Sequence, residues 1–451
     1  MNIIIVGCGK VGTAIAEQIC NEKHNVTIID EKASVIEEIT NRLDVMGIVG
    51  NGATYSILKE AGVESANLLI AVTNQDELNI LCCMFARKAS KCNTIARVRN
   101  PQYKDDITYL KDELGLSMIL NPEYDAAMEM ARILRFPSAN KIDTFAKGRV
   151  ELLNFTVNEG SVIEGKTIID IAKSIKVPFL ISAVERDGQV HIPGGSFIIR
   201  ANDVIRFIAQ PSAAREFFSK IGVDTHQVKN TIIAGGGKTA YYLAKLLNSS
   251  GIKVCIIEKD RNRCEELSTE LPHVSIICAD ATDQDVLKEE GIESVESFVA
   301  LTKMDEGNIF LSLYAKQFSN IKVITKINHI SNNDIVRNFN LGSIITPKNI
   351  TADIVLSYVR AMQNGMGSNV ETLYRIVENK VEALEFKVGN ESKITGIPIE
   401  ELKIKKNILI GCINRNGQIM IASGKTVIKS GDTVIVITTT TGLNDLSDIL
   451  E

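Results

Sequence analysis

The sequence predicts an α/β fold: two tandem Rossmann-like parallel-sheet domains, each followed by a small α+β domain. Three observations predict this fold class. Strands alternate with amphipathic helices, a glycine-rich turn joins the first strand to its helix, and the same series of motifs recurs later in the chain. Alternating strands and helices are typical of a parallel sheet that is covered by helices on both faces.

The opening stretch has the pattern of a dinucleotide-binding turn. An apolar strand at 2–6 leads into Gly7, Gly9 and Gly12, and a helical run follows. Glycines at this spacing permit a tight turn, let the backbone approach a pyrophosphate, and let helix and strand pack closely. The helix would direct its free N–H groups and the positive end of its dipole at phosphate oxygens.

A second strand distinguishes this motif from an empty Rossmann-like turn. The strand at 26–30 ends in Asp30, 18 residues after Gly12. A carboxylate in this place accepts hydrogen bonds from ribose hydroxyls and repels a 2′-phosphate. The pattern therefore predicts a dinucleotide site that prefers NAD(H).

The chain contains an internal duplication. The first matched positions, 228 residues apart, are Gly7 with Gly235, Gly9 with Gly237, Gly12 with Ala240 and Asp30 with Glu258. After a one-residue insertion the offset is 229, and it relates Thr73 to Thr302, Asp76 to Asp305, Asn79 to Asn308 and Arg97 to Lys326. Chance does not hold one register over so many positions, so the second copy is expected to repeat the fold of the first.

The ends of the predicted strands locate the candidate site. In the first copy the strands are expected near 2–6, 26–30, 45–49, 67–72, 94–98 and 117–120. Parallel sheets of this kind bind ligands at the C-terminal ends of their strands. The candidate cofactor-binding residues are Gly7, Cys8, Gly9, Lys10, Val11, Gly12, Asp30, Asn51, Gly52, Thr73, Asn74 and Arg97 in the first copy, and Gly235, Gly236, Gly237, Lys238, Thr239, Glu258, Asp280 and Thr302 in the second.

Several of these residues have a second interpretation. Arg97 and its neighbour Arg99 suit phosphates because guanidinium groups match phosphate geometry, but both would also fit a solvated strand end. Lys10 and Lys238 lack the spacing of a Walker motif, so we expect only a supporting electrostatic role. Asp280 would reach an adenine or a ribose, or it would cap its own loop.

The two copies are not expected to be equivalent. Glu258 keeps the acid of Asp30 on a longer side chain, and Lys326 lacks the guanidinium of Arg97. The sequence therefore predicts a well-formed first site and a second site that differs in affinity or in ligand. ATP and ADP are further candidate ligands beside NAD(H). Cys8, in the phosphate turn, is either a redox-sensitive thiol or a small residue that fits.

A helix is expected to leave each parallel sheet. Asn121-Pro122 and Thr346-Pro347 are good helix start signals, and Pro137 would close the first helix. The apolar faces of these helices need a partner surface. We expect crossover helices that form a dimer, and the alternative is that each folds back on its own domain.

A second, β-rich type of module follows each helix. Asp187-Gly188 and Asn416-Gly417, set between apolar runs, are strong hairpin signals. Short helices are expected at 167–175 and about 397–404. The predicted domains are 1–138, 148–226, 229–365 and 370–451, and low-periodicity segments are expected at 138–148 and 364–370.

Composition narrows the class of protein. The 451 residues suggest three or four domains, and the net charge of −5 argues against a nucleic-acid partner. No apolar run long enough to span a membrane is present, and no basic leader precedes the first strand, so neither a spanning helix nor a signal peptide is expected. Nine cysteines without metal or disulfide spacing indicate a reduced, cytoplasmic compartment.

The residues point to binding rather than to a reaction. An NAD-dependent oxidoreductase, the alternative function, needs a proton donor beside the nicotinamide. The β-rich modules lack an acid–base cluster, and His191 is replaced by Met420 in the second copy. Five scattered histidines give no ligand spacing. We therefore predict no enzyme activity, no catalytic residue and no metal site.

The ordered, duplicated motifs resemble a known family, the peripheral regulators of Trk-type potassium uptake that contain tandem RCK (also called KTN) domains. The resemblance covers essentially the whole chain. The matching motifs are Gly7–Gly12, Val49–Gly52, Ala71–Asn74, Ile95–Arg99, Ala279–Thr282 and Ala300–Thr302. The sequence departs from the family pattern at Cys278, where many relatives carry Gly.

The resemblance implies a function that the residues alone do not. It implies a cytoplasmic, nucleotide-sensing regulatory subunit, peripheral at the inner face of the membrane. Its partner would be an integral membrane potassium translocator of the TrkH or TrkG type, gated through binding of NAD(H) and adenine nucleotides. The resemblance also implies a homo-oligomeric ring, a dimer or a tetramer.

Overall fold

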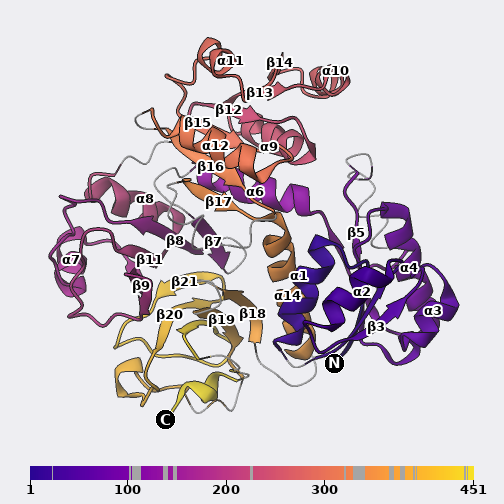
Figure 1. Cartoon of the computed structure of the whole chain (residues 1–451). Coiled ribbons are helices and arrows are strands. Elements are labelled where there is room, and N and C mark those ends of the chain that lie inside the picture. The colour runs from indigo at the N-terminus through magenta and orange to yellow at the C-terminus, as the bar shows by residue number, and fades with distance from the viewer. Residues whose placement is uncertain are drawn as a thin grey trace.

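The framework of the chain consists of two parallel sheets of six strands each and two antiparallel sheets of five strands each (Figure 1). The structure is a computed structural model. It describes residues 1–22, 24–100, 103, 113–135, 141–145, 150–223, 227–318, 321–328, 341–364, 370–375, 381–389, 392, 394–440, 443 and 445–451.

The first parallel sheet has the strand order β3-β2-β1-β4-β5-β6, which is the order of a dinucleotide-binding fold. Its elements are β1 Asn2–Val6, α1 Lys10–Cys20, β2 Asn25–Asp30, α2 Ala33–Thr40, β3 Met46–Val49, α3 Tyr55–Glu60, η1 Val63–Ser65, β4 Leu68–Ala71, α4 Asp76–Ala89, β5 Asn93–Arg97 and β6 Met118–Leu120. All five neighbouring strand pairs are parallel. The six predicted strands are confirmed, with ends that differ by one residue at most.

The second parallel sheet repeats this order as β14-β13-β12-β15-β16-β17. Its elements are β12 Asn230–Ala234, α9 Lys238–Ser249, β13 Lys253–Glu258, α10 Arg261–Glu270, β14 Ser275–Cys278, α11 Gln284–Glu289, β15 Ser297–Ala300, α12 Asp305–Ala315, β16 Lys322–Lys326 and β17 Ser343–Ile345. The expected duplication of the fold is confirmed.

Each parallel sheet is followed by an antiparallel one, with strand orders β10-β9-β11-β8-β7 and β18-β19-β22-β20-β21. The first contains β7 Lys141–Phe145, β8 Val150–Thr156, α7 Ile168–Ile175, β9 Phe179–Arg186, β10 Gln189–His191, β11 Val204–Ala209 and α8 Pro211–Lys220. The second contains β18 Val370–Arg375, β19 Glu382–Lys387, η4 Ile399–Glu401, β20 Ile408–Arg415, β21 Gln418–Ile421, β22 Thr433–Thr438 and η5 Leu446–Ile449.

Both predicted hairpins are present. Asp187 and Gly188 have φ of 52° and 75°, and Asn416 and Gly417 have φ of 52° and 86°. Two successive left-handed residues are the requirement of the two-residue turn whose twist matches antiparallel strands, and Asn-Gly and Asp-Gly meet it at low cost.

Two expectations for the β-rich modules are corrected. The helix expected at about 397–404 is only the 3₁₀ turn η4, because Pro398 at its start offers no side-chain acceptor, whereas Thr167 caps α7 by accepting from Asp170 N–H. The segment 138–148, expected to lack periodicity, contains β7. This edge strand obtains its order from pairing with β8 and not from its own alternation.

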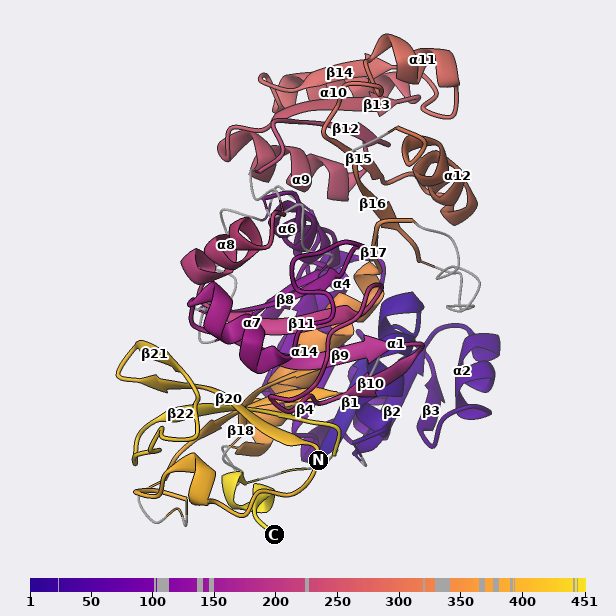
Figure 2. The same cartoon turned by 90° about the vertical axis from the view of Figure 1, so that its left-hand side faces the viewer.

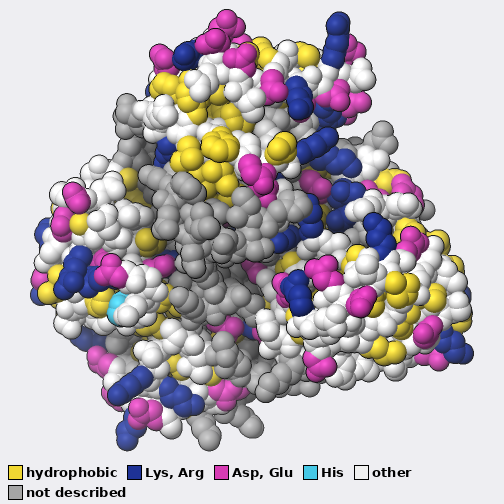
Figure 3. Space-filling model, viewed as in Figure 1, with side chains coloured by type: hydrophobic (Ala, Val, Ile, Leu, Met, Phe, Trp, Pro, Cys, Tyr) yellow, Lys and Arg dark blue, Asp and Glu magenta, His cyan; other side chains and the backbone are white. Residues whose placement is uncertain are grey.

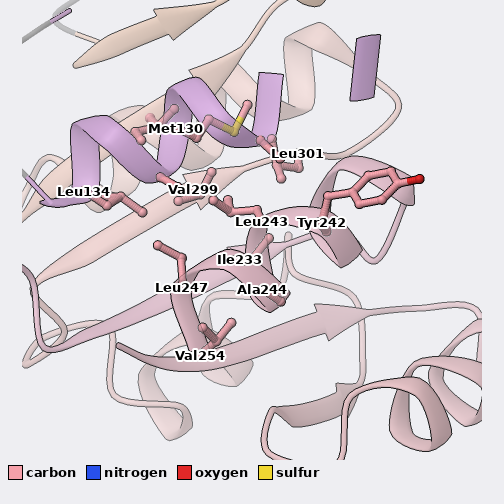
Figure 4. Packing of buried hydrophobic residues seen from close by; sticks show 14 of the residues in the cluster. Met130, Leu134, Ile233, Tyr242, Leu243, Ala244, Leu247, Val254, Val299 and Leu301 are labelled. Atoms are coloured by element: carbon pink, nitrogen blue, oxygen red, sulfur yellow. The ribbon is translucent and has the colours of Figure 1, made fainter. Parts of the chain in front are cut away.

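The two crossover helices exchange partners within the chain. Helix α6 (Pro122–Arg135) leaves the first parallel sheet and packs against α9 of the second, whereas α14 (Pro347–Asn364) leaves the second sheet and packs against α1 of the first (Figures 1 and 2). Figure 4 shows Met130 and Leu134 of α6 facing Leu243 and Leu247 of α9, all fully buried.

This exchange differs from both expectations for the helices. The alternative that each helix folds back on its own domain is wrong. The partner surface of each helix belongs to the other repeat of the same chain, so the apolar faces expected to form a dimer are covered within one chain. Pro137, expected to close α6, lies outside the described residues, as do most of the segments expected at 138–148 and 364–370.

The two antiparallel sheets also pack on each other. Their shared core joins Leu152 and Ile208 of the first module to Ala383, Cys412 and Ile435 of the second. The two repeats are therefore held together through both the exchanged helices and the paired modules. None of the helices in the described ranges combines the length and the apolar character that a bilayer crossing requires.

Candidate nucleotide-binding sites

The glycine turn of the first repeat is fixed by its surroundings. Gly7 has φ of 92°, and a Cβ there would lie 2.7 Å from Thr73 N. A Cβ on Gly12 would collide with the carbonyl oxygen of Gly7. Both positions therefore require glycine, as the motif predicted. In the second repeat Gly235 has φ of 104°. Ala240, which takes the position of Gly12, is fully buried.

The middle glycine of each turn has a different role. Gly9 and Gly237 have φ of −71° and −69°, which any residue adopts, and a Cβ at either would meet no protein atom within 4 Å. Neither the backbone nor packing therefore requires glycine at these positions. Each lies at the N-terminus of its helix, α1 or α9, where no side chain caps the helix. The open space and the uncapped N–H groups fit the pyrophosphate of a dinucleotide.

The acid at the end of the second strand is held by backbone donors in both repeats. Asp30 accepts from the N–H groups of Cys8 at 2.8 Å and Lys32 at 3.0 Å. Glu258 accepts from Gly236 at 2.6 Å and Asp260 at 2.9 Å. The longer glutamate thus contacts the equivalent donors, and each carboxylate lies beside its phosphate turn, where a ribose would approach.

Cys8 and Gly236 account for how two different acids occupy equivalent places. Cys8 is buried, with Sγ 3.7 Å from Ile29 O, and burial together with Asp30 raises its pKa to about 12. It therefore stays protonated, which favours the small residue that fits over the redox-sensitive thiol. In the second repeat a Cβ on Gly236 would lie 2.7 Å from Leu267 Cδ1 and 3.0 Å from Cβ and Cγ of Glu258, so glycine makes room for the extra methylene.

A buried amide orders the loop after the fourth strand in each repeat. Asn79 accepts from Thr73 N at 2.8 Å and Thr73 Oγ1 at 2.7 Å, and it donates to Arg97 O at 2.9 Å. Asn308 makes the same bonds to Thr302 and Lys326. Sequence comparison paired these asparagines but assigned them no role. They position the predicted residues Thr73 and Thr302.

The basic residues at the end of β5 and β16 are not solvated strand ends. Arg97 is 7% exposed, and its Nη2 donates to Thr73 O at 2.5 Å and lies 3.3 Å from Asn74 Oδ1. Burial, with the neighbouring Arg99, lowers its pKa to about 10. Lys326 donates to Leu301 O at 3.0 Å, and burial lowers its pKa to about 8. Arg97 therefore stays charged at neutral pH, while Lys326 titrates closer to it.

The loops after the third strand of each sheet are closed by similar caps. Asn51 Oδ1 accepts from Ala53 N at 2.8 Å, and Asp280 Oδ1 accepts from Thr282 N at 2.9 Å and Thr282 Oγ1 at 2.8 Å. These bonds lower the pKa of Asp280. The structure thus shows the loop-capping interpretation of Asp280, and contact with a ligand stays a prediction. A Cβ on Gly52 would collide with Val6, so this loop also needs glycine.

One residue beside the second site escaped the sequence analysis. Arg263, in the first turn of α10, donates from Nε to Gly236 O at 2.8 Å and pairs with Glu266 at 2.7 Å. The corresponding residue of the first repeat is Val35. An arginine shortly after the acid of the second strand was the available signal, because arginines in this region contact the adenosine end of dinucleotides.

The structure brings the two sites toward each other. Tyr242 of α9 donates to Arg99 O at 3.3 Å and accepts from Asn121 at 3.1 Å. Glu123 of α6 pairs with Arg99 at 3.5 Å and also acts electrostatically on Lys326 of the other repeat. Figure 3 shows Lys and Arg side chains gathered where the second parallel-sheet domain, at the top, faces the first, at the right.

The remaining predicted residues lie at the starts of the first helices. They are Lys10 and Val11 in α1, and Lys238 and Thr239 in α9. Lys10 and Lys238 are exposed, as a supporting electrostatic role requires. Among the residues that the structure describes, no group of three or more His, Cys, Asp or Glu side chains is placed to hold a metal ion.

Comparison with known proteins identifies matching families and relatives. The TrkA-N domain family model matches residues 3–122 and 231–347, and the TrkA-C domain family model matches 152–222 and 383–451. The Trk system potassium uptake protein TrkA homolog 1 of Methanosarcina mazei is 32% identical over 97% of each chain. The Trk system potassium uptake protein TrkA of Haemophilus influenzae is 29% identical over 97% of this chain and 95% of its own.

Solved structures share the fold at lower identity. The GsuK RCK domain superposes with a TM-score of 0.64 and 17% identity, over 97% of this chain and 92% of that one. The GsuK channel bound to NAD superposes with a TM-score of 0.63 and 16% identity, over 97% of this chain and 77% of that one. At such identities the likeness shows the fold alone.

Proposed function

Because the chain belongs to the TrkA family of Trk system potassium uptake proteins, we propose that it is a regulatory subunit of potassium transport that senses nucleotides. The match extends over 97% of the chain and of its relative in Methanosarcina mazei. Each of the two TrkA-N matches contains its own glycine turn. The family membership that the motifs predicted is confirmed.

The carboxylate held beside each phosphate turn carries this proposal. Asp30 is fixed by two backbone donors at the place where ribose hydroxyls would bind, and Gly9 leaves open space over an uncapped helix N-terminus. The proposed ligand of the first site is NAD(H). In support, a solved GsuK channel structure is described as bound to NAD and another as bound to ADP.

The predicted site residues would divide the ligand between them. The N–H groups at the start of α1 would hold the pyrophosphate, Asp30 the adenosine ribose, and Arg97 a phosphate or the far end of the ligand. The second repeat would use the start of α9 and Glu258, with adenine nucleotides as its proposed ligands. The loops at Asn51, Gly52, Asn74 and Asp280 would close around the ligand.

Ligand binding would act on transport by favouring one arrangement of the repeats. A ligand shifts such an equilibrium only through its different affinity for the two states, typically about 1–3 kcal/mol. Arg99, two residues beyond Arg97, pairs with Glu123 of the crossover helix α6. A change at the first site would therefore reach the helix that packs on the second repeat.

The remaining parts of the proposal concern assembly. The partner would be an integral membrane potassium translocator of the TrkH or TrkG type, to which a cytoplasmic, homo-oligomeric ring of this chain docks. The role is regulatory and not enzymatic. The proposed domains are 1–138, 148–226, 229–365 and 370–451. The four sheets and the four family matches support this division.

Potassium flux tests the proposal. The full chain would be co-expressed with a Trk-type translocator in potassium-uptake-deficient cells, and flux into inverted vesicles would be followed while NADH, NAD and ATP are varied. We expect nucleotide-dependent flux that is lost without this chain and altered by Asp30→Ala. Potassium flux that does not change with the concentration of any of these nucleotides would contradict the proposal. Turnover of NADH against a metabolite panel, read by its absorbance, would favour an oxidoreductase instead.

A further inference from the structure

Two cysteines of the second repeat lie together beside the candidate site. Cys278 is the last residue of β14 and stands opposite Glu258 in the parallel register of β13 and β14. Cys264, on α10, has its Sγ 3.2 Å from Glu258 O. Ala279, the residue after Cys278, donates its N–H to the same carbonyl oxygen of Glu258 at 3.0 Å, so the two cysteines lie on either side of this strand end. Helix α10 and strand β14 lie side by side in both cartoon views (Figures 1 and 2).

The two thiols differ in their access to solvent. All nine cysteines lie within the described residues, and Cys278 alone among them is exposed. Cys264 is 6% exposed. Burial, with contributions from Cys278, Glu258 and Asp260, raises the pKa of Cys264 to about 11, so it is a thiol and not a thiolate at neutral pH. An oxidant in solution therefore meets Cys278 first, and Cys264 stays available as the second thiol.

We propose that Cys264 and Cys278 are a modification site, a thiol pair that peroxides convert reversibly into a disulfide that alters nucleotide binding at the second site. The Cys278 thiolate attacks hydrogen peroxide, the O–O bond breaks, and a sulfenic acid and, after protonation, water form. The Cys264 sulfur then attacks the Cys278 sulfur, the S–O bond breaks, and the departing hydroxide takes the Cys264 proton. Two thiols and one peroxide yield a disulfide and two waters.

The consequence for binding follows from what the pair touches and rests on the proposed function. Cys264 in its thiol form donates to Glu258 O, and oxidation removes this donor. A disulfide also ties α10 to β14, and α10 contains Arg263, which bonds to Gly236 O in the phosphate turn. Oxidation is therefore expected to weaken adenine-nucleotide binding at the second site.

The first repeat offers no equivalent pair. The residues that correspond to Cys264 and Cys278 are Ile36 and Val49. The buried thiol of the first site, Cys8, has its pKa raised to about 12 and contacts Ile29 O. Oxidation is therefore expected to leave the first site unchanged, which provides an internal control.

Peptide mapping of the full chain tests the modification. After treatment with hydrogen peroxide and blocking of free thiols, non-reducing digestion is expected to yield a peptide that links Cys264 to Cys278. The link should be released by dithiothreitol, be absent from Cys278→Ser, and persist in Cys255→Ser, which removes a half-buried thiol of the neighbouring strand. The proposal would be overturned if Cys278 were recovered as a sulfinic acid, or if Cys264 remained a free thiol after Cys278 had been oxidised.

Binding measurements test the consequence. Calorimetric titration of ADP into Asp30→Ala protein, whose first site is disabled, should give at least about threefold weaker binding after oxidation, restored by reduction and absent in Cys278→Ser. A linked peptide with unchanged ADP affinity would overturn the regulatory part. If ADP bound in neither state, the proposed function of the second site would be contradicted, while the linked peptide would still establish the disulfide.

Discussion

Gly236 lies against Glu258: the carboxylate accepts from the Gly236 N–H at 2.6 Å, and a Cβ on Gly236 would lie 3.0 Å from Cβ and Cγ of the glutamate. The first repeat has Cys8 and Asp30 in these places, with an N–H to carboxylate distance of 2.8 Å. A larger turn residue thus accompanies the shorter acid, and glycine accompanies the longer one. The two residues act as a matched pair within each repeat.

This pairing predicts that Gly236→Ala weakens the second site. The added methyl would displace Glu258 and its charge-assisted hydrogen bond, which is worth about 1.5–3 kcal/mol, so ADP affinity should fall about tenfold or more. Calorimetric titration of ADP into protein that also carries Asp30→Ala measures this loss of affinity. The matched control Cys8→Ala should leave NADH affinity at the first site nearly unchanged, and equal losses in both variants would refute the pairing.

The two acids are expected to report on different ligands. Asp30→Ala should reduce NADH binding most, and Glu258→Ala should reduce ATP or ADP binding most, because each removes the acceptor for the ribose of its own site. Titration of NADH and ATP into each single variant measures both effects. If each variant lost the same affinity for both ligands, the two sites would be equivalent, contrary to the prediction.

Lys326 is expected to make the second site sensitive to pH. Its pKa is lowered to about 8, chiefly by burial and also by Lys10, against the opposing effects of Asp305 and Glu123. An anionic ligand favours the protonated amine, so binding above the pKa must take up a proton, and affinity falls as the pH rises. Between about pH 7 and about pH 9 the loss should approach tenfold.

The control for this pH dependence is Lys326→Arg. A guanidinium stays protonated throughout this range, so ADP affinity of the variant should be flat with pH. NADH binding at the first site, where Arg97 has its pKa lowered only to about 10, should also be flat. An equally steep fall in the arginine variant would assign the effect to another group.

The crossover helix predicts a destabilisation that appears in the other repeat. Leu134 is fully buried in the core that α6 shares with α9, so Leu134→Ala should cost about 2–5 kcal/mol of unfolding free energy. Hydrogen exchange should show lost protection in α9 of the second repeat. Leu81→Ala, on an outer helix where Leu81 is 40% exposed, is the control and should have a small effect. Faster exchange confined to the first repeat would contradict the exchange of helices.

Local signals explain why the strands and turns were predictable. A few neighbouring residues define each of these features: the glycine turn at Gly7, the acid at Asp30 and the Asp187-Gly188 hairpin. The types of these residues indicate the backbone conformation directly. The internal repeat then doubled every such signal. By contrast, β7 was missed because an edge strand of five residues is ordered by its pairing with β8.

Long-range packing explains what was not predictable. Arg97 fits a solvated strand end in sequence, and only the folded loop shows it buried against Thr73. Asn79 became a positioning residue because its amide bonds to Thr73 after β4 and to Arg97 at the end of β5, a relation between segments that no local pattern encodes.

By itself the sequence determined the two Rossmann-like units, their β-rich modules and the places of the two glycine turns, because these depend on local backbone preference and on periodic burial. Only the tertiary structure decided that α6 and α14 exchange partners, that Gly236 makes room for Glu258, and that Cys264 and Cys278 both lie beside Glu258. Each of these is a contact between surfaces far apart in the chain, and its energy depends on a shape complementarity that exists only once the chain has folded.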